Sequence, residues 1–492
     1  MYNNFAQLVC DGVNSKKVAV KHDSGSITYA ELRKAVKQFA YQLREKKIVA
    51  GDKVIILMSD RIEWIIAFLG CMYAGAVPTL VSPLLLAKKF NEAVEISKAR
   101  AVITDVDTNL ISDSDITIFT PKDVTRSSKQ LDNAHKFLPD EIALLIPSSG
   151  TTGRQKFIAH RHQNFFTYID KVPAVMALDH SSIVYGTSTL SHIAGLNVTI
   201  VLALGMNATA ILSNKKVSPT LVYQTMIDNN VTHFHSHPGV FALMTVNVNK
   251  SLPIPSLEFA GCFSQKYPEK IALEWEKIYG LFPQNGYGTT ETFSLTLLQV
   301  PSSSEDRDVS LGQPVPGTQI EIRNDQGQLC ERNVIGELYV SSPTSGSYYL
   351  NDWNSTKETF VGHWIKTNDL VYQDNDDNIH YVRRSDDVVK INGLLVSMSE
   401  VQEAIEQHPD VEECVVQKST NQHGLDKLST QIVMKKERSV DTTSIRHFLL
   451  EVLEATKVPK YIEVVEDLPI DLVDEVAKTI SGKKIYKKEL GE

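Results

Sequence analysis

The chain has no long apolar run, no leader-like N-terminus and few cysteines. Its longest apolar stretch, Val198 to Leu212, is interrupted by two threonines, a glycine and an asparagine. That stretch is shorter than the roughly 20 apolar residues that cross a bilayer. No basic region followed by an apolar run stands at the N-terminus, so we expect no signal peptide. Five scattered cysteines without CxxC spacing favour reduced thiols and a cytoplasmic location over a disulfide scaffold or a zinc site.

An excess of positive charge is also lacking. The formal net charge is -9, and no basic stretch carries interleaved aromatic residues, which argues against nucleic-acid binding. The composition, 42% hydrophobic and 22% charged residues, is typical of a globular enzyme. A length of 492 residues suggests roughly three domains or subdomains.

Apolar strand patterns alternate with helical patterns along the chain. A buried helix is expected from Glu63 to Tyr73, and strands are expected at 53–58, 77–81, 101–104 and 208–212. Such alternation predicts parallel sheets with helices on both faces. From Leu311 to Tyr381 the strands become short and the turns frequent, which suggests an antiparallel, barrel-like piece. After Asp386 a small α+β domain is expected, with helices at 399–408 and 443–453 and strands at 411–418 and 430–435.

The most informative segment follows the apolar run 143–147, which predicts a buried strand. It contains the candidate phosphate-binding residues Ser148, Ser149, Gly150, Thr151, Thr152, Gly153 and Lys156. Glycines let backbone N–H groups approach phosphate oxygens, hydroxyls add donors, and the lysine adds charge. The two glycines are too close together for a Walker loop, which needs four residues between them. The alternative for this segment alone is a polar strand-to-helix turn.

A second segment, Asn285 to Glu291, reads Asn-Gly-Tyr-Gly-Thr-Thr-Glu. An aromatic residue between glycines, Tyr287, can offer its ring face to a purine. The carboxylate of Glu291 suits Mg²⁺, which takes oxygen ligands and usually only one or two carboxylates. In isolation the segment is also compatible with a surface turn.

Three further segments follow in the chain: Trp364–Leu370, Arg383–Gly393 and Lys478–Lys483. Together and in this order, the five segments resemble the signature motifs of the adenylate-forming superfamily, which comprises acyl-CoA synthetases, luciferases and peptide-synthetase adenylation domains. The resemblance runs from about Ser26 to Lys483 and so covers nearly the whole chain.

The resemblance implies an α/β fold in two domains. Residues 1–385 are expected to form a large N-terminal AMP-binding domain of two α/β layered subdomains plus a distorted β-barrel. Residues 386–492 are expected to form a small, mobile α+β lid domain, with the active site between the two domains.

The resemblance also implies roles for individual residues. In the second segment, Tyr287 packs on adenine, Thr290 contacts phosphate and Glu291 holds the metal, with Gly288 and Thr289 beside the nucleotide. Gly261 and Cys262 match a segment that flanks adenine and the acyl pocket.

In the later segments, Asp369 accepts hydrogen bonds from the ribose hydroxyls and Arg384 contacts the nucleotide. Asp386 is the hinge between the domains, and Gly393 lies beside the pantetheine arm. Lys483 is expected to bridge the acyl carboxylate and the α-phosphate, because its long stem and compact charge suit that position.

The chain departs from the family pattern at several positions. Gln155, Asn368, Arg383 and Tyr486 stand where the family has proline, glycine, glycine and often arginine, respectively. Asn368 can still support the turn, because asparagine tolerates positive φ. The connection from Leu468 to Lys478 is longer than usual, which bears on how Lys483 reaches the site.

Residues on the acyl side indicate the class of acid. His192 cannot supply the anion that pairs with an ammonium group in amino-acid-activating relatives, which argues against α-amino acids. It is either a gate of the acyl pocket or a satisfied buried histidine. The strand with His233, His235 and His237 is a weak candidate for a metal cluster and is more simply a wall of the acyl pocket, where His237 could bond a polar substrate group. Bulky Phe263 favours a short or flat acid.

The sequence therefore predicts an ATP-dependent, AMP-forming carboxylic acid:CoA ligase for an aryl or short-to-medium acyl acid, most similar to benzoate and coumarate CoA ligases. Its catalytic candidates are Lys483, Thr290, Glu291 and His192, and its expected cofactors and partners are ATP, Mg²⁺, coenzyme A and a small carboxylic acid. Two alternatives remain open. One is an adenylating enzyme that loads a carrier-protein phosphopantetheine, and the other is a nucleotide-binding pseudoenzyme.

Overall fold

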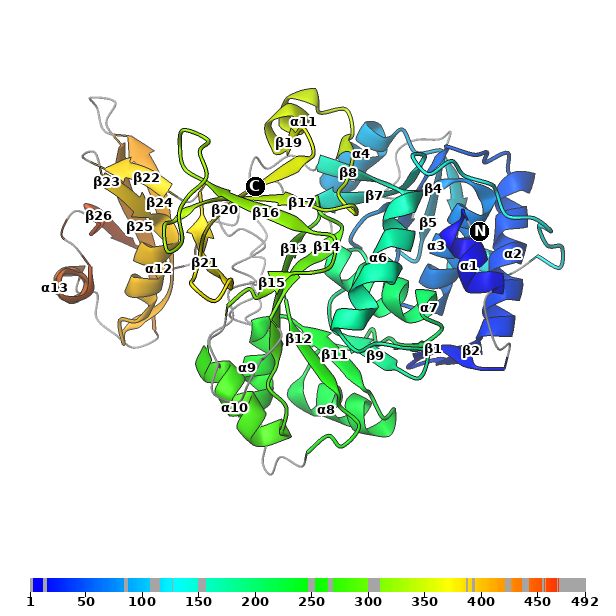
Figure 1. Cartoon of the computed structure of the whole chain (residues 1–492), viewed down its shortest axis with the longest axis horizontal. Coiled ribbons are helices and arrows are strands. Elements are labelled where there is room, and N and C mark those ends of the chain that lie inside the picture. Colours follow the sequence, from blue (N-terminus) through cyan, green and yellow to red (C-terminus); the bar gives the residue numbers. More distant parts are fainter. Residues whose placement is uncertain are drawn as a thin grey trace. The chain divides into compact units, whose positions relative to one another are not determined.

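The computed structural model divides the chain into two compact units (Figure 1). The first consists of Met1–Arg323, Leu338–Thr367 and Gln373–His380, and the second of Asn324–Glu337, Asn368–Tyr372 and Tyr381–Glu492. The structure describes residues 3–11, 16–83, 87–106, 116–125, 127–148, 156–246, 253–263, 269–299, 310–385, 388–391, 394–420, 426–435, 442–453, 455, 457–466 and 468. Within these ranges, every helix is too short or too polar to cross a bilayer.

A seven-stranded sheet in the first unit carries the candidate phosphate loop. Its order is β18-β8-β7-β4-β3-β5-β6. The strands are β3 (Lys53–Leu57), β4 (Val77–Leu80), β5 (Ala101–Thr104), β6 (Thr117–Phe119), β7 (Ile142–Ser148), β8 (Lys156–Arg161) and β18 (Tyr348–Tyr349). The run from β7 to β6 is parallel, whereas β8 and β18 are added antiparallel at one edge.

Helices cover both faces of this sheet, as the alternating patterns predicted. On β3, Val54 and Ile56 belong to the core that contains α2 (Tyr29–Glu45) and α3 (Ile62–Ala74). Their neighbours Ile55 and Leu57 belong to a separate core on the other face, with α4 (Ala87–Ser97). Successive side chains of a strand point to opposite faces, so one apolar strand feeds two cores.

A nine-stranded sheet forms the second layer of the first unit, in the order β15-β14-β13-β12-β11-β9-β10-β1-β2. The strands are β1 (Val18–His22), β2 (Gly25–Thr28), β9 (Ile183–Gly186), β10 (Thr209–Ile211), β11 (His233–Ser236), β12 (Phe259–Cys262), β13 (Gln284–Thr289), β14 (Ser294–Leu298) and β15 (Gln313–Pro314). The neighbouring strands β13, β12, β11, β9, β10 and β1 are parallel to one another. At the two edges, β2 is antiparallel to β1, β14 is antiparallel to β13, and β15 is antiparallel to β14.

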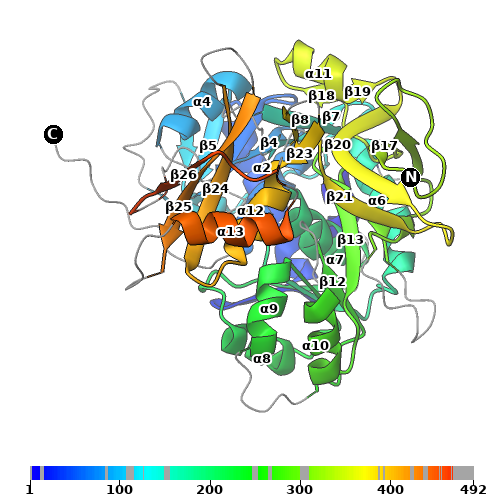
Figure 2. The ribbon, with the colours of Figure 1, turned by 90° about the vertical axis from the view of Figure 1, so that its left-hand side faces the viewer.

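The two sheets share a hydrophobic core. Helix α6 (His162–Val175) and the π-helix Gly195–Leu202 contribute to this core, which also contains residues of β3 and β10. The outer face of the nine-stranded sheet packs on α8 (Pro219–Asp228), α9 (Pro238–Val246) and α10 (Glu269–Tyr279) around Trp275. These three helices stand together in Figures 1 and 2. The short helices α1 (Phe5–Asp11), α5 (Pro121–Val124) and α7 (Ala203–Gly205) complete this part.

A five-stranded sheet corresponds to the predicted distorted barrel. Its order is β16-β17-β20-β19, with β21 also on β20. The strands are β16 (Gln319–Arg323), β17 (Gly336–Ser341), β19 (Phe360–Val361), β20 (Trp364–Gln373) and β21 (Ile379–Arg384), and α11 (Trp353–Thr359) precedes β19. Buried and half-buried residues alternate along β20 from Ile365 to Val371.

The second unit contains the predicted small α+β region. A hairpin of β22 (Val388–Ile391) and β23 (Leu394–Ser397) precedes a sheet of β24 (Val411–Thr420), β25 (Asp426–Met434) and β26 (Tyr461–Val464). Helices α12 (Met398–Glu406) and α13 (Thr442–Val452) lie side by side and share an apolar core with these strands (Figure 2). The expected helices and strands of this region are confirmed. The predicted domain boundary at Asp386 lies outside the described residues and stays a prediction.

Gly312 lies just before the edge strand β15, close to the backbone of the neighbouring strand β14. Replacing it tests how closely the two backbones pack. Its φ is +77°, and a Cβ there would lie 2.0 Å from the carbonyl oxygen of Leu298. We expect Gly312→Ala to lower the free energy of unfolding by about 3 kcal/mol, since it combines left-handed strain with a backbone clash. Gly280 has φ +78° with nothing within 4 Å, so Gly280→Ala should cost only about 1–2 kcal/mol. Equal losses in urea unfolding would contradict the packing argument.

Candidate active site

The candidate phosphate loop connects two antiparallel strands. Ser148 ends β7 and Lys156 begins β8, and the two residues face each other in the ladder. The alternative of a strand-to-helix turn is therefore wrong. The candidate residues Ser149, Gly150, Thr151, Thr152 and Gly153 and the side chain of Ser148 lie outside the described part of the structure.

Lys156 is held in place by the start of α11. Its ammonium donates a hydrogen bond to Ser355 Oγ at 2.7 Å and lies 3.8 Å from Asp352 Oδ2. Asp352 caps α11, because its carboxylate accepts hydrogen bonds from the Ser355 backbone N–H (3.0 Å) and hydroxyl (2.7 Å). Nζ also lies 5.4 Å from the centre of the Tyr349 ring. The lysine is thus positioned by polar partners and by a cation–π contact.

The same tyrosine contacts Glu291. The Tyr349 hydroxyl donates a hydrogen bond to Glu291 Oε1 at 2.7 Å. Burial and the neighbouring carboxylate raise the pKa of Tyr349, so its proton stays on the phenol. Lys156 from β8 and Glu291 after β13 therefore meet at one aromatic ring of β18.

The turn that carries Thr290 and Glu291 is fixed on several sides. Thr289 and Thr292 exchange hydrogen bonds between their backbone N–H groups and hydroxyls at 3.0 and 3.3 Å. The Gly346 N–H donates to the Glu291 carbonyl at 2.7 Å. A Cβ on Gly346 would lie 2.7 Å from Ile158 Cγ2, so only glycine allows this approach.

Sequence reasoning missed the polar residues below this turn. Asn164 of α6 is fully buried and its Nδ2 donates to the carbonyls of Thr344 (2.7 Å) and Ser345 (3.1 Å). His160 of β8 is also fully buried, with its ring 4.8 Å from that of Phe293. The sequence did show polar residues at short intervals after Lys156, among them His160 and Asn164. Their spacing does not reveal which loop these side chains contact.

Gly261, which was predicted to flank the nucleotide, and Gly286 on the next strand both lie under a phenylalanine. A Cβ at Gly261 would lie 2.4 Å from Phe263 Cζ, and one at Gly286 would lie 2.5 Å from Phe263 Cε1. The ring of Phe263 therefore covers two neighbouring strands, β12 and β13, where neither has a side chain. Cys262 points to the opposite core, and burial raises its pKa well above the usual range, so it remains a thiol.

The histidine-rich strand β11 is buried and internally bonded. His233 bonds the Thr232 hydroxyl (2.8 Å) and the Met176 carbonyl (2.9 Å), and His235 Nε2 lies 2.7 Å from Thr199 Oγ1 of the π-helix. Burial lowers the pKa of His235 to about 3. No group of three or more metal-ligating residues occurs in the described ranges, so β11 carries hydrogen bonds here.

The side chain of His192 is exposed, at the start of the turn that leads into the π-helix. The alternative of a buried histidine is therefore wrong, and a gate at the acyl pocket stays a prediction. Gly195 holds this turn close, because a Cβ there would lie 2.2 Å from the Thr189 carbonyl oxygen.

In the second unit, Asn368 and Asp369 have the expected local geometry. Asn368 has φ +60°, so it adopts the left-handed conformation that its replacement of glycine requires. Its carbonyl accepts a hydrogen bond from the Ser385 N–H at 2.6 Å, and Asp369 is buried. Asp386, Gly393, Lys483 and the side chain of Arg384 lie outside the described residues, so their roles stay predictions.

Two α/β layers carry a hairpin that ends at Lys156 and a turn that holds Glu291, and both side chains contact Tyr349. A family model described as AMP-binding enzyme matches residues 10–350. The chain belongs to this family, which confirms the predicted superfamily and fold class.

Individual relatives are similar over nearly their whole length. The chain is 27% identical to a 4-hydroxybenzoate–CoA/benzoate–CoA ligase of Rhodopseudomonas palustris, over 95% of this chain and 89% of the relative. It is 27% identical to a benzoate–CoA ligase of Thauera aromatica, over 94% and 90%.

Among solved structures, a benzoate CoA ligase from Burkholderia xenovorans is similar with a TM-score of 0.81 and 25% identity, covering 95% of this chain and 97% of that one. An o-succinylbenzoate CoA synthetase from Bacillus subtilis has a TM-score of 0.87 at 22% identity and covers 99% of each chain, which supports the fold alone.

Removing one hydroxyl tests the Tyr349–Glu291 contact. In Tyr349→Phe the Glu291 carboxylate loses a hydrogen bond of the charge-assisted kind, so we expect the Mg²⁺ concentration for half-maximal ATP–pyrophosphate exchange to rise about tenfold. Tyr41→Phe is the matched control, because this tyrosine of α2 contacts Lys129 and lines neither the candidate active site nor the β18 strand. An unchanged Mg²⁺ requirement in Tyr349→Phe, or an equal change in the control, would sink the assignment.

Buried histidines make the first unit sensitive to acid. Burial lowers the pKa values of His160, His162 and His235 to about 3, below the value of about 6.5 in an unfolded chain. The unfolded state binds more protons between pH 6.5 and 3, so stability is present above pH 6.5 and is lost as the pH falls. Each histidine contributes up to about 1.4 kcal/mol per pH unit to the slope of the unfolding free energy against pH.

His235→Gln should flatten the pH dependence of unfolding by that amount, whereas His363→Gln, at an exposed position, should not. Identical slopes for the parent and His235→Gln would refute the burial argument.

Proposed function

We propose that the chain is an ATP-dependent carboxylic acid:CoA ligase that forms an acyl-AMP and then an acyl-CoA thioester. The observation that carries the proposal is the meeting of Lys156 and Glu291 at Tyr349, with bonds of 2.7 Å from Tyr349 to Glu291 and from Lys156 to Ser355. A cation and an acceptor for a metal then stand side by side at the end of the phosphate-loop hairpin. That pair suits the triphosphate of Mg·ATP.

The residues present fit Mg²⁺. The Tyr349 hydroxyl donates its hydrogen bond to Oε1 of Glu291. The second carboxylate oxygen is left for Mg²⁺, a hard cation that usually takes one or two carboxylates. When bound, the ion neutralises charge on the departing pyrophosphate. Lys156 adds a second positive charge, and the Thr290 hydroxyl is our candidate donor to a phosphate oxygen.

In the proposed first half-reaction, the carboxylate of the acid attacks the α-phosphate of ATP and pyrophosphate leaves. Lys483 would stabilise the charge that develops at the phosphorus. A thiol then attacks the acyl carbon and AMP leaves, which conserves the free energy of ATP in the thioester. Rotation of the lid at Asp386 would exchange Lys483 for the thiol, which passes beside Gly393.

The proposed acid is aryl or short-to-medium in length. The Phe263 ring covers Gly261 and Gly286, which shortens the space above β12 and β13 and favours a flat or short acyl group. His192 offers no anion to an ammonium group. The benzoate–CoA ligases named above act on acids of this shape, and their similarity in sequence extends over nearly the whole chain.

ATP–pyrophosphate exchange over a panel of acids tests the adenylation step, and acyl-CoA formation with free CoA tests the second step. We expect benzoate-like acids to support both. Exchange without acyl-CoA would indicate a carrier-protein phosphopantetheine as the acceptor. Nucleotide binding without exchange for any acid would indicate a pseudoenzyme and overturn the proposal.

Replacing Lys483 tests whether this lysine serves only the first of the two half-reactions. We expect Lys483→Ala to slow adenylation about 100-fold or more, the scale of one lost contact to a developing charge. Thioester formation from supplied acyl-AMP should remain near the parent rate, because the lysine serves only the first step. Lys484→Ala is the matched control for loss of a neighbouring positive charge. Equal loss in both half-reactions would show that Lys483 is structural.

A further inference from the structure

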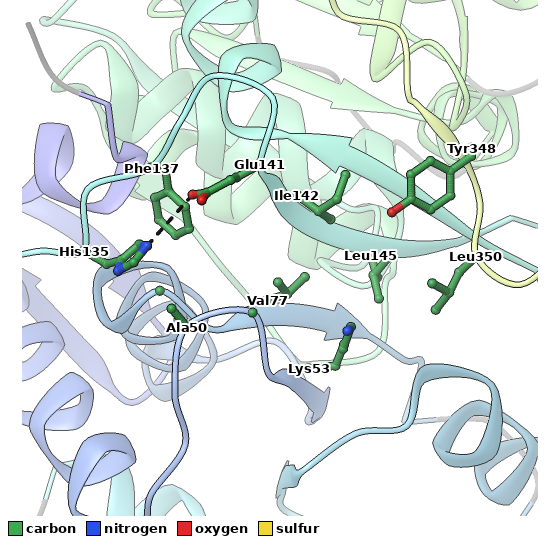
Figure 3. Close-up of a pocket in the computed structure, with 12 residues that line it drawn as sticks. Ala50, Lys53, Val77, His135, Phe137, Glu141, Ile142, Leu145, Tyr348 and Leu350 are labelled. Carbon is green, nitrogen blue, oxygen red and sulfur yellow. Dashed lines mark ion pairs between the residues drawn. The ribbon is translucent and has the colours of Figure 1, made fainter.

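A pocket of about 360 Å³ lies on the α4 face of the seven-stranded sheet, within the first unit (Figure 3). Its apolar floor consists of Val77, Ile142, Leu145 and Leu350, which all belong to or pack against the core that contains α4. This volume is within the usual range for small-molecule sites.

The pocket lies at the opposite end of β7 from the phosphate loop. Ile142 is the first residue of β7 and Ser148 is the last, so about 20 Å of strand separates them. Lys53 and Val77 are likewise the first residues of their strands. The pocket is therefore distinct from the site that Lys156 and Glu291 define.

Two polar side chains face the pocket without a partner. Among the described residues, neither the Lys53 ammonium nor the Tyr348 hydroxyl has a hydrogen bond or an ion pair. Figure 3 shows both groups directed toward the space beside Ile142, Leu145 and Leu350. An ammonium on an apolar floor favours an anion with an apolar body, because the anion gains a charge-assisted hydrogen bond and the body is removed from water.

The other two polar side chains at this pocket, His135 and Glu141, lie beside each other. His135 Nε2 lies 3.9 Å from Glu141 Oε2, which also accepts a hydrogen bond from the Leu138 N–H at 3.2 Å. The carboxylate of Glu141 repels an anion at its own end. The charged group of a ligand is thereby directed to Lys53.

Strand β18 connects this pocket to the candidate active site. Tyr348 and Leu350 line the pocket, whereas Tyr349 between them belongs to the shared core on the other face and bonds Glu291. The strand is only two residues long and is paired with β8 through Tyr348–Ala159 and Tyr349–Ile158. A ligand that packs on Tyr348 and Leu350 holds this short strand, and with it the Tyr349 hydroxyl, in place.

We propose that this pocket is a second ligand site, for a small monocarboxylate with an apolar body whose carboxylate binds Lys53, and that its occupancy tightens the binding of Mg·ATP through β18. The coupling rests on the proposed function, because it acts on Glu291, whereas binding in the pocket does not. The ligand is either the acid substrate itself or another acid of the same chemistry.

Fluorine NMR with 4-fluorobenzoate tests binding on the full-length protein. We expect Lys53→Met to weaken a saturable binding event at least about tenfold, the scale of one hydrogen bond to a charged group. Lys171→Met, which removes a positive charge outside the pocket, should bind as the parent does. The neutral 4-fluorobenzamide should not compete, and Tyr348→Phe should weaken binding less than Lys53→Met. Thermal unfolding checks that each variant is folded.

Any binding at the acyl site itself remains in Lys53→Met, so the difference between the parent and this variant reports the pocket alone. Equal affinity of the two proteins for 4-fluorobenzoate would overturn the second site, whether or not the protein makes acyl-AMP. Displacement of the probe from the parent by hexanoate would show that an aliphatic acid shares the site, and failure of hexanoate to displace it would restrict the site to aromatic acids. Both results retain a carboxylate site.

The coupling is tested by titrating the magnesium complex of an ATP analogue that cannot be cleaved between the α- and β-phosphates, with and without 4-fluorobenzoate. We expect the acid to lower the dissociation constant of this analogue about fivefold more in the parent than in Lys53→Met. The same change in both proteins would place the coupling at the acyl site and overturn the link through β18. Loss of acyl-AMP formation with intact pocket binding would contradict the proposed function and leave the second site standing.

Discussion

The hydrogen bond between the Tyr349 hydroxyl and the Glu291 carboxylate joins the two sheets of the first unit at the candidate active site. Tyr349 is on the edge strand of the seven-stranded sheet, and Glu291 follows the last parallel strand of the nine-stranded sheet. Lys156 lies over the same ring. A phenol can donate to a carboxylate with its hydroxyl and attract an ammonium with its ring face, so one side chain positions both charges. The polar and apolar contacts around the turn serve to keep this arrangement fixed.

This geometry depends on a core that both sheets share. Helix α6 begins directly after β8 and carries buried Asn164, which bonds the loop that also holds the Glu291 carbonyl. Buried amides and imidazoles cost free energy unless they are bonded. The side-chain N–H groups of Asn164 find partners in the carbonyls of Thr344 and Ser345, and these two bonds hold the loop against α6. His160 and His162, which stay neutral because they are buried, make the same region dependent on pH.

The two faces of the seven-stranded sheet have different tasks. One face packs on the shared core and presents Tyr349 to Glu291. The other packs on α4 and leaves a pocket that is lined by Lys53. Because side chains alternate along a strand, two adjacent residues of β18 belong to these different environments. A short edge strand held by few ladder bonds is the part of a sheet most easily stabilised by a ligand.

The sequence by itself determined the family, the α/β layering and most element positions. Buried strands such as β3 and β5 are short and apolar and alternate with helical patterns, and these signals are local. Asn368 at positive φ was also predictable, because its tolerance of that conformation belongs to the residue itself. Local signals did not determine the partners of Lys156 and Glu291. Lys156 and Ser355 are 199 positions apart and Glu291 and Tyr349 are 58 apart, so only the pairing of β18 with β8 brings them together. The cover of Phe263 on Gly286 and the pocket at Lys53 were likewise decided by tertiary packing, because each brings together strands that are adjacent in space and distant in sequence. The exposure of His192 was also visible only in the structure.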